Sequence, residues 1–258
     1  MSPEEIEKMY RLEDTYWWFV ARRRLAGLLL HDALPPGSDR HLLDVGCGTG
    51  ATMQVLARYG RVWGVDPSTE ALARCCQRGF SNLSQGAAEA LPFSVETFEV
   101  VTCLDVLEHA DDEAALAELF RVCKPGGWLL ITVPAYRLLW SEHDEALRHR
   151  RRYCAGELRR KVEAAGFRVC RLTYVLAILL LPIALFRLAQ RLYKRQRAAP
   201  KTAHIILPNL LNRLLVWLLD VEARLARLVS LPFGVSIVCV ARKPADPQAA
   251  TEGQTHPR

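Results

Sequence analysis

A glycine-rich turn and a distant carboxylate are the first residues whose types and spacing suggest chemistry. The turn, 46–50, reads Gly-Cys-Gly-Thr-Gly and directly follows the apolar run 41–45, while Asp66 ends the next apolar run. Glycines let a backbone approach a ligand closely and direct free amide groups at it. A carboxylate at the end of the second strand can accept hydrogen bonds from both hydroxyls of a ribose. This combination predicts a nucleotide-binding site.

Asp44, two residues before the turn, narrows the choice of nucleotide. A dinucleotide carries an anionic pyrophosphate, which a carboxylate beside the turn would repel, whereas the ammonium and sulfonium of S-adenosylmethionine would be attracted. The glycines are also spaced G-x-G-x-G and not G-x-G-x-x-G, the dinucleotide pattern. A dinucleotide-dependent oxidoreductase remains the closest enzymatic alternative.

Groups able to handle protons and anions follow two later strands. Asp105, Glu108 and His109 come after the apolar run 98–104, and a dense set lies at 140–153. In an α/β sheet the carboxyl ends of the strands bind ligands. If S-adenosylmethionine is the ligand of the turn, the molecule that receives its methyl group, the acceptor, is expected to bind at this edge. We expect His143, oriented by Asp144, or else His109, to serve as catalytic base. We expect the acceptor to be bound by the remaining candidates, which are Trp140, Arg151 and Tyr153.

Basic residues at 148–152 have two open interpretations, a solvated face or a clamp for a phosphate or carboxylate of the acceptor. Cys47 and Cys103 are expected to be small packing residues more often than reactive thiols. The eight cysteines are scattered and show no C-x-x-C pair, so we expect no metal site and a reducing compartment.

The elements that must position these groups alternate along the chain. Strands are expected at 41–45, 61–66, 98–105, 126–134, 166–175 and 234–244, with helices between them. Such alternation predicts an α/β fold with a mostly parallel, doubly wound sheet flanked by helices. A helical N-terminal segment, 1–40, precedes the sheet, and a polar tail, 245–258, is expected to be disordered.

Several segments together resemble class I S-adenosylmethionine-dependent methyltransferases, in the broad group that contains the ubiquinone and menaquinone biosynthesis enzymes. They read LLDVGCGTG, VWGVDPS, EALPF, VVTCLDVLEH and LFRVCKPGGWLLITVP. The resemblance spans roughly 41–172 and resumes at 234–243. It implies a Rossmann-like, seven-stranded sheet whose antiparallel last strand lies between the fifth and sixth.

The resemblance also implies roles for individual residues. The cofactor's amino-acid end would lie on the turn near Asp44, with its ribose on Asp66. Many relatives have an Asp for the adenine amino group where this chain has Ala87, so that contact would pass to the backbone near Ala88. The cofactor-binding residues expected on this basis are Asp44, Gly46, Cys47, Gly48, Gly50, Asp66, Pro67, Ala87, Ala88, Cys103 and Leu104.

Charge and apolar character are concentrated in one segment. The chain has a net charge of +6, but 164–219 contains no acidic residue and nine basic ones. Within it, 172–186 is uncharged and too short to span a bilayer comfortably. We therefore expect 174–233 to be a helical, membrane-associated insertion that could accept a lipid-linked substrate at the cytoplasmic face of the cell membrane. Packing of both helices on the sheet, or a homodimer interface, is the alternative.

Other functions agree less well with the sequence. A nucleic-acid methyltransferase would explain the cations, but these alternate with Leu and Ile and not with stacking aromatics. A non-catalytic, membrane-bound scaffold is permitted by Ala87 but not favoured by the intact turn and its two carboxylates. Trp17 and Trp18 are expected either to cover the bound cofactor or to pack the N-terminal helix on the sheet.

Overall fold

The computed structural model describes residues 3–34, 39–193 and 207–245. Its centre is a seven-stranded sheet in the order β3-β2-β1-β4-β5-β7-β6, in which β7 alone runs antiparallel to its neighbours β5 and β6. This confirms the mostly parallel α/β fold with its inserted last strand. The strands are β1 His41–Val45, β2 Arg61–Asp66, β3 Leu83–Gln85, β4 Phe98–Leu104, β5 Cys123–Pro134, β6 Arg168–Val175 and β7 Ser236–Arg242.

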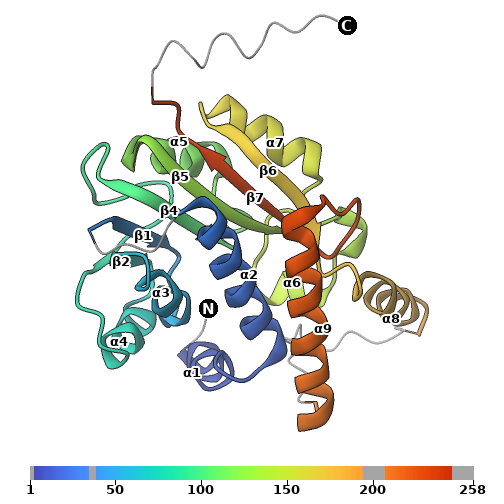
Figure 1. Ribbon diagram of the computed structural model, residues 1–258. Coiled ribbons are helices and arrows are strands. Elements are labelled where there is room, and N and C mark those ends of the chain that lie inside the picture. Colours follow the sequence, from blue (N-terminus) through green and yellow to red (C-terminus); the bar gives the residue numbers. More distant parts are fainter. Residues whose placement is uncertain (1–2, 35–38, 194–206, 246–258) are drawn as a thin grey trace, which may run out of the picture.

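Alternating residues of the strands bury opposite faces of this sheet. Leu42 faces a core shared with helices α2, α3, α4 and α9, whereas Leu43 faces a core shared with α5 and α7 (Figure 1). Both strand faces are apolar because both are covered by helices. The helices in chain order are α1 Pro3–Leu12, α2 Trp17–Ala33, α3 Ala51–Leu56, α4 Thr69–Gln77, α5 Asp112–Val122, α6 Glu142–Ala146, α7 Ala155–Ala164, α8 Leu180–Tyr193 and α9 Asn209–Leu228, with a short 3-10 helix η1 at Arg137–Leu139.

The segment 174–233 is an insertion between β6 and β7, as the sequence predicts. It is not one helical stretch from residue 174, because β6 continues to Val175 and the described helices are α8 and α9. Helix α9 lies beside α2, where Arg227 forms an ion pair with Asp32 and Asn212 Oδ1 accepts a hydrogen bond from the Trp17 amide at 3.0 Å. One side of α9 therefore packs on the domain, which agrees with part of the packing alternative.

The buried residues of α9 are Leu219, Glu222, Ala223 and Ala226. Ala223 and Ala226 are buried against the sheet, while both oxygens of the buried Glu222 accept hydrogen bonds from the Ala177 and Ile178 amides, each at 3.0 Å. Within the described ranges, none of the helices has both the length and the apolar character needed to span a bilayer. The tail predicted to be disordered lies, apart from residue 245, outside the described residues.

Candidate cofactor and acceptor site

The glycine turn leaves β1 at the carboxyl edge of the sheet. The amides of Gly46 and Cys47 both donate to the Val65 carbonyl oxygen, at 2.8 and 3.1 Å. Gly46, Gly48 and Gly50 have φ values of 68°, 54° and 88°, a left-handed backbone that favours glycine. A Cβ on Gly46 would lie 2.3 Å from Val106, so a side chain is excluded there. The turn therefore keeps its backbone bare at the mouth of the site.

Asp44 lies below this turn and is almost fully buried. Its Oδ1 accepts a hydrogen bond from Thr102 Oγ1 at 2.6 Å, while Oδ2 has no partner among the described residues. Burial raises the pKa of Asp44 to about 7, although Thr102 and the nearby Arg22 oppose this shift. A buried carboxylate oxygen without a partner is costly, and a ligand cation placed there would relieve that cost.

The ribose and adenine candidates occupy the neighbouring strand ends. Asp66 accepts hydrogen bonds from the Gly48 and Ser68 amides, both at 2.9 Å, so it fixes the turn on which the cofactor would lie. Pro67 and Ala87 are exposed, and Gly86 donates from its amide to the Asp66 carbonyl oxygen at 3.3 Å. Ala88 is buried. The glycine turn and the residues that follow β2 and β3 therefore lie along the same edge of the sheet.

The N-terminal helices close over the turn and add residues that the sequence did not reveal. Glu13, buried between α1 and α2, accepts hydrogen bonds from Thr49 Oγ1 of the turn and from Arg78 Nη2, the latter at 2.6 Å. The terminal carbon of Met9 would be 3.2 Å from a Cβ on Gly48. The helices α1 and α2, which we call the lid, are therefore held to the turn by polar groups, and α1 covers the turn.

Arg22 of α2 is the second residue missed by sequence reasoning. Its Nη1 forms an ion pair with Asp105, which has a φ of 55° directly after β4 and accepts a hydrogen bond from Thr132 Oγ1 at 2.8 Å. Arg22 Nε is buried without a partner within the part of the chain described. Arg22 is also close enough to Asp44 to act on its pKa. A lid helix thus delivers a guanidinium, which suits a carboxylate ligand, to the strand ends.

These residues fit S-adenosylmethionine. The free oxygen of Asp44 suits an ammonium, the partner-free Nε of Arg22 suits the cofactor's carboxylate, and Asp66 retains lone pairs for ribose hydroxyls. Because its glycines have no side chains, the turn lets the ligand lie close to the backbone.

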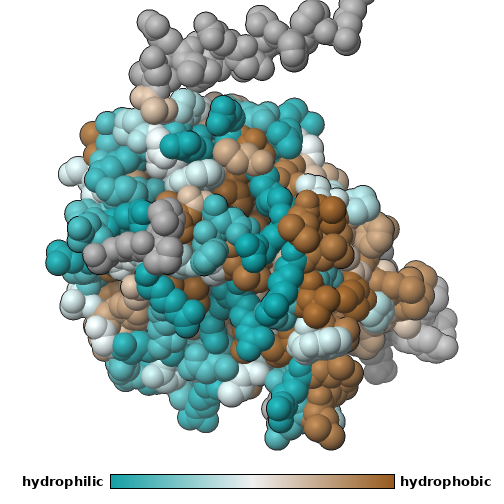
Figure 2. Space-filling view, in the orientation of Figure 1, coloured by the Kyte–Doolittle hydropathy of each residue, from teal (hydrophilic) through white to brown (hydrophobic). Residues whose placement is uncertain are grey.

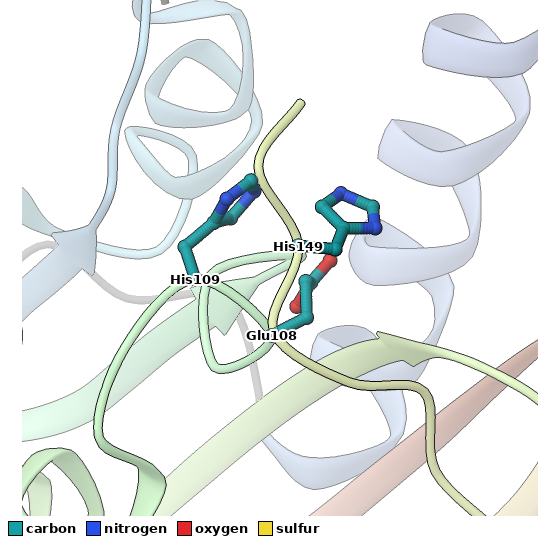
Figure 3. A group of neighbouring side chains, drawn as sticks. All are labelled: Glu108, His109 and His149. Carbon is teal, nitrogen blue, oxygen red and sulfur yellow. The ribbon is translucent and has the colours of Figure 1, made fainter. Parts of the chain in front are cut away.

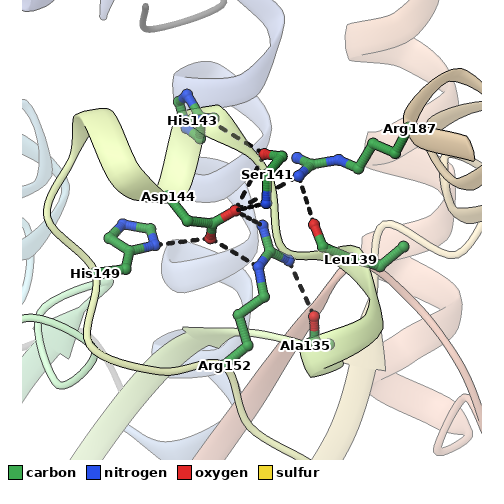
Figure 4. A network of polar contacts seen from close by, with 8 residues as sticks. All are labelled: Ala135, Leu139, Ser141, His143, Asp144, His149, Arg152 and Arg187. Atoms are coloured by element: carbon green, nitrogen blue, oxygen red, sulfur yellow. Dashed lines mark hydrogen bonds and ion pairs between the residues drawn. The ribbon is translucent and has the colours of Figure 1, made fainter. Parts of the chain in front are cut away.

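Asp144 does not orient His143, and this part of the prediction is wrong (Figure 4). The fully buried Asp144 caps α6 through the Ser141 amide and accepts a hydrogen bond at Oδ1 from His149 Nδ1 at 2.9 Å. The ring centroids of His143 and His149 are 6.5 Å apart. Burial alone would raise the pKa of Asp144, but hydrogen bonds from His149 and Arg152 hold it below its ordinary value. The paired base is therefore His149.

Glu108, His109 and His149 form a cluster in front of β4 (Figure 3). Each offers one ligand atom, and these atoms lie within 4.8 Å of one another, a spacing compatible with a divalent cation. Burial and the neighbouring His149 lower the pKa of His109 to about 4, so its imidazole is neutral at pH 7. Burial and Asp105 raise the pKa of Glu108, whose Oε2 has no partner among the described residues. His109 thus lies beside His149, and its role as a catalytic base stays a prediction.

The three residues predicted to bind the acceptor have different surroundings in the structure. Tyr153 is fully buried, and its hydroxyl lies 3.0 Å from Asp112 Oδ2, so it belongs to the core and cannot line an acceptor site. Arg151 forms an ion pair with the same carboxylate at 2.8 Å, which satisfies its charge within the chain. Trp140 follows η1 at intermediate exposure, beside the cluster around Asp144.

Both cysteines of the site pack as small side chains. Cys47 Sγ lies 3.9 Å from Cys75 Sγ under the turn, and Cys103 is fully buried in the core between the sheet, α5 and α7. The hydrogen bond to Cys75 and burial raise the pKa of the Cys47 thiol, and burial does the same for Cys103. Cys103 can therefore border the cofactor only through its backbone, as can its buried neighbour Leu104.

A small cavity of about 30 Å³ lies between the sheet edge, α2 and α9. Trp18, Arg22 and Asp105 form its polar end, and its apolar wall includes Leu25, Leu176, Leu219 and Ala223. Trp17 and Trp18 both pack in an apolar cluster with residues of α8 and α9. The two tryptophans therefore seat the lid helix on the insertion, and Trp18 in addition borders the site.

Part of the chain matches a known protein family. Residues 43–131, which contain the turn, Asp66 and Glu108, match the family described as a methyltransferase domain. Within residues 43–131 the chain is therefore similar to a methyltransferase domain. The cofactor of such domains is the one that the site fits.

Curated relatives of this chain include methyltransferases named for ubiquinone biosynthesis and for a phytyl-hydroquinone. A ubiquinone biosynthesis O-methyltransferase from Paracidovorax citrulli is 32% identical over 147 residues, which are 51% of this chain and 62% of the relative. A 2-methyl-6-phytyl-1,4-hydroquinone methyltransferase from Synechocystis is 35% identical over 121 residues, 44% of this chain and 36% of the relative. The match to this chain thus spans less than two thirds of the length of each relative.

Solved structures share the fold at low sequence identity. The complex of the Haloferax volcanii Trm112 methyltransferase activator with a methyltransferase gives a TM-score of 0.61 at 20% identity, over 93% of this chain and 94% of that one. Haemonchus contortus phosphoethanolamine N-methyltransferase 2 with S-adenosyl-L-methionine gives 0.55 at 20% identity, over 85% of this chain and 52% of that one. At these identities the likeness supports the fold alone.

Proposed function

We propose that this methyltransferase transfers a methyl group from S-adenosylmethionine to a hydroxyl of a lipid-linked, quinone-type acceptor at the cytoplasmic face of a membrane. The observation that carries the transfer to oxygen is the hydrogen bond between Asp144 and His149, at 2.9 Å, beside the end of β4. A phenolic hydroxyl must lose its proton as it attacks carbon, so a positioned base favours an oxygen acceptor.

The chain's own residues supply binding, orientation and the proton acceptor. When bound, the cofactor supplies a methyl group already activated on a positively charged sulfur. Asp144 stays ionised and accepts Nδ1–H, which leaves Nε2 of His149 with a lone pair. His149 then takes the acceptor's hydroxyl proton as the oxygen–carbon bond forms and the carbon–sulfur bond breaks. Closure of α1 and α2 excludes water from this reaction.

The acceptor class is inferred from the relatives and from an apolar surface. Both quoted relatives are named for quinone or phytyl-hydroquinone chemistry. In this chain, large exposed apolar side chains gather on α8 and α9 (Figure 2), and we call this set the α8–α9 surface. It comprises Leu181, Leu185, Phe186 and Leu188 of α8 with Leu210, Leu211, Leu214, Trp217, Val221, Leu225 and Leu228 of α9.

An anionic bilayer is the partner that suits the α8–α9 surface. Contiguous exposed apolar patches on soluble proteins mark protein or membrane contacts. Exposed Arg213 and Arg224 adjoin the apolar residues of α9, and the segment 164–219 has no acidic residue at all. Such cations gain about 1 kcal/mol each near an anionic leaflet. The surface lies on the insertion that also walls the cavity, so a lipid tail would have a short path to the site.

Replacement of His149 tests the proposed chemistry. His149→Ala and Asp144→Asn should each lower kcat roughly 100-fold or more, because a positioned base contributes that much, while S-adenosylmethionine affinity changes little. Label transfer onto a lipid extract would give the rate, and calorimetry the affinity. His31→Ala, at an exposed position on α2, is the matched control. Parental rates in both variants would exclude the base.

Incubation with a chelator distinguishes two possible functions of the cluster formed by Glu108, His109 and His149. If His149 acts as a base alone, incubation with EDTA leaves the rate unchanged. Loss of activity with EDTA and recovery with Mn²⁺ or Zn²⁺ would instead show that a cation held by Glu108, His109 and His149 binds the acceptor oxygen and lowers the pKa of its hydroxyl, so that the proton is released to water.

A further inference from the structure

Helix α8 has two faces with different surroundings. The side chains of Leu181, Leu185 and Leu188 on its outer face are 67%, 57% and 53% exposed. Ile183 and Ala184, on the inner face, pack in the apolar cluster that contains Trp17, Trp18 and Leu139. Helix α8 therefore joins the α8–α9 surface to the segment just before α6.

Arg187 makes the polar part of this connection (Figure 4). Its Nη1 donates to the carbonyl oxygen of Leu139 and lies 3.5 Å from Asp144 Oδ2. The side chain is 16% exposed, so its charge is largely withdrawn from water and depends on these partners. The carbonyl it holds ends η1, two residues before the helix-capping Ser141.

Asp144 carries this contact to His149. Its Oδ2 accepts from the Ser141 amide at 2.9 Å and from Arg152 Nη2 at 3.1 Å, while Oδ1 accepts from His149 Nδ1 at 2.9 Å and from Arg152 Nε at 2.7 Å. The His149 amide also donates to the Asp144 carbonyl oxygen at 2.8 Å. One buried carboxylate thus links α8, the cap of α6 and the imidazole.

We propose that Arg187 is a positioning residue through which the seating of α8 on an anionic bilayer orders Asp144 and His149, so that membrane contact activates the enzyme. This regulation rests on the proposed function and concerns the same site. The occupant of the outer face of α8 is the bilayer, because the exposed leucines need an apolar environment and the segment 164–219 is purely cationic.

The coupling follows from differential binding. A bilayer that contacts α8 more favourably in one position than in another shifts α8 towards that position. Because Arg187 reaches Leu139 and Asp144 from α8, the same shift favours the arrangement in which His149 is held. Couplings of this kind typically change an equilibrium about fivefold or more.

Hydrogen exchange tests the coupling without knowledge of the acceptor. Vesicles of phosphatidylcholine and phosphatidylglycerol (3:1) should slow amide exchange in 141–152 about fivefold in the parental protein. Arg187→Ala should still float with the vesicles but lose this difference, and Arg187→Lys should restore part of it. Arg159→Ala, at a 46% exposed position on α7, is the matched control and should behave as the parent. Leu185→Asp should lose flotation and slowing together.

The possible outcomes distinguish the coupling from α8 through Arg187 to His149, which we call the relay, from methyl transfer itself. A vesicle effect of parental size in Arg187→Ala, or flotation of the parent without slower exchange, would overturn the relay and leave methyl transfer standing. Failure of the parent to float would overturn the membrane location and the relay together. Methyl transfer itself is measured in the absence of vesicles, so its failure is seen separately.

Discussion

At the scale of the residue, Asp44 makes the clearest prediction about pH. Its pKa is raised to about 7 by burial, above the ordinary value of 3.8, so the folded state holds this proton more tightly than the unfolded state. The free energy of unfolding should therefore fall as pH rises from about 4 to about 7. Asp44→Asn should remove this fall and make the ligand-free protein more stable than the parent at pH 8.

Calorimetric Tm measurements from pH 4.5 to 8 check this. The gap between variant and parent should shrink towards the acid end, and Thr102→Val serves as a control for the lost hydrogen bond. The same Asp44→Asn change should weaken S-adenosylmethionine binding roughly tenfold or more, because a charged partner of the ammonium is lost. A variant that is less stable at pH 8 yet binds the cofactor as the parent does would refute both the shift and the role.

Residue roles were predictable where the chain itself brings groups together. The turn and Asp66 lie where the sequence placed them, since adjacent parallel strands end at one edge. The pair His143 and Asp144 was wrong because neighbouring residues of a helix do not face each other. Asp144 meets His149 instead, and Arg22 meets Asp105, through folding that no local pattern encodes.

At the scale of the element, the N-terminal lid gives the next prediction. Glu13→Ala removes the buried acceptor of Thr49 Oγ1 and Arg78, so the latch on the glycine turn should open. Cofactor dissociation should accelerate about tenfold, because a buried partner left unsatisfied costs about 1–3 kcal/mol. Asp14→Ala is the matched control, since Asp14 binds the same Arg78 but is half exposed. Stopped-flow displacement gives the rates, and equal rates in the two variants would exclude the latch.

Elements with long apolar runs were predictable, and short or composite ones were not. β2 has the predicted bounds, and Ser68 caps α4, its Oγ accepting from the Ala71 amide at 3.2 Å. β3 has only three residues, too few for a pattern, and pairs with β2 alone. Glu222 of α9 accepts hydrogen bonds from the amides of Ala177 and Ile178, a contact that no local pattern in the sequence indicates.

At the scale of the whole molecule, the sheet, lid and insertion meet at one edge. The insertion contributes Leu219 and Ala223 to the cavity, and the lid contributes Trp18 and Arg22. Exposed leucines on the far side of the insertion then face the proposed membrane (Figure 2). Such an arrangement would draw the cofactor from water and the acceptor from lipid.

Liposome flotation measures the membrane half of this arrangement. The parent should float with vesicles that contain phosphatidylglycerol and float less with phosphatidylcholine alone, because both apolar burial and charge contribute. Trp217→Asp, at a 60% exposed position on α9, should reduce flotation. Leu138→Asp, 77% exposed but on η1, is the control. A parent that remains in solution with both vesicle types would leave the dimer interface as the explanation of the surface.

Transfer of a ¹³C-methyl group from labelled S-adenosylmethionine onto a total lipid extract tests the central claim most directly. The label should enter a lipid-soluble product as a methyl ether, as shown by its ¹³C chemical shift, and His149→Ala should lower its rate of appearance roughly 100-fold or more. Label found on nitrogen or carbon, or only in water-soluble products, or an equal rate in His149→Ala, would contradict it.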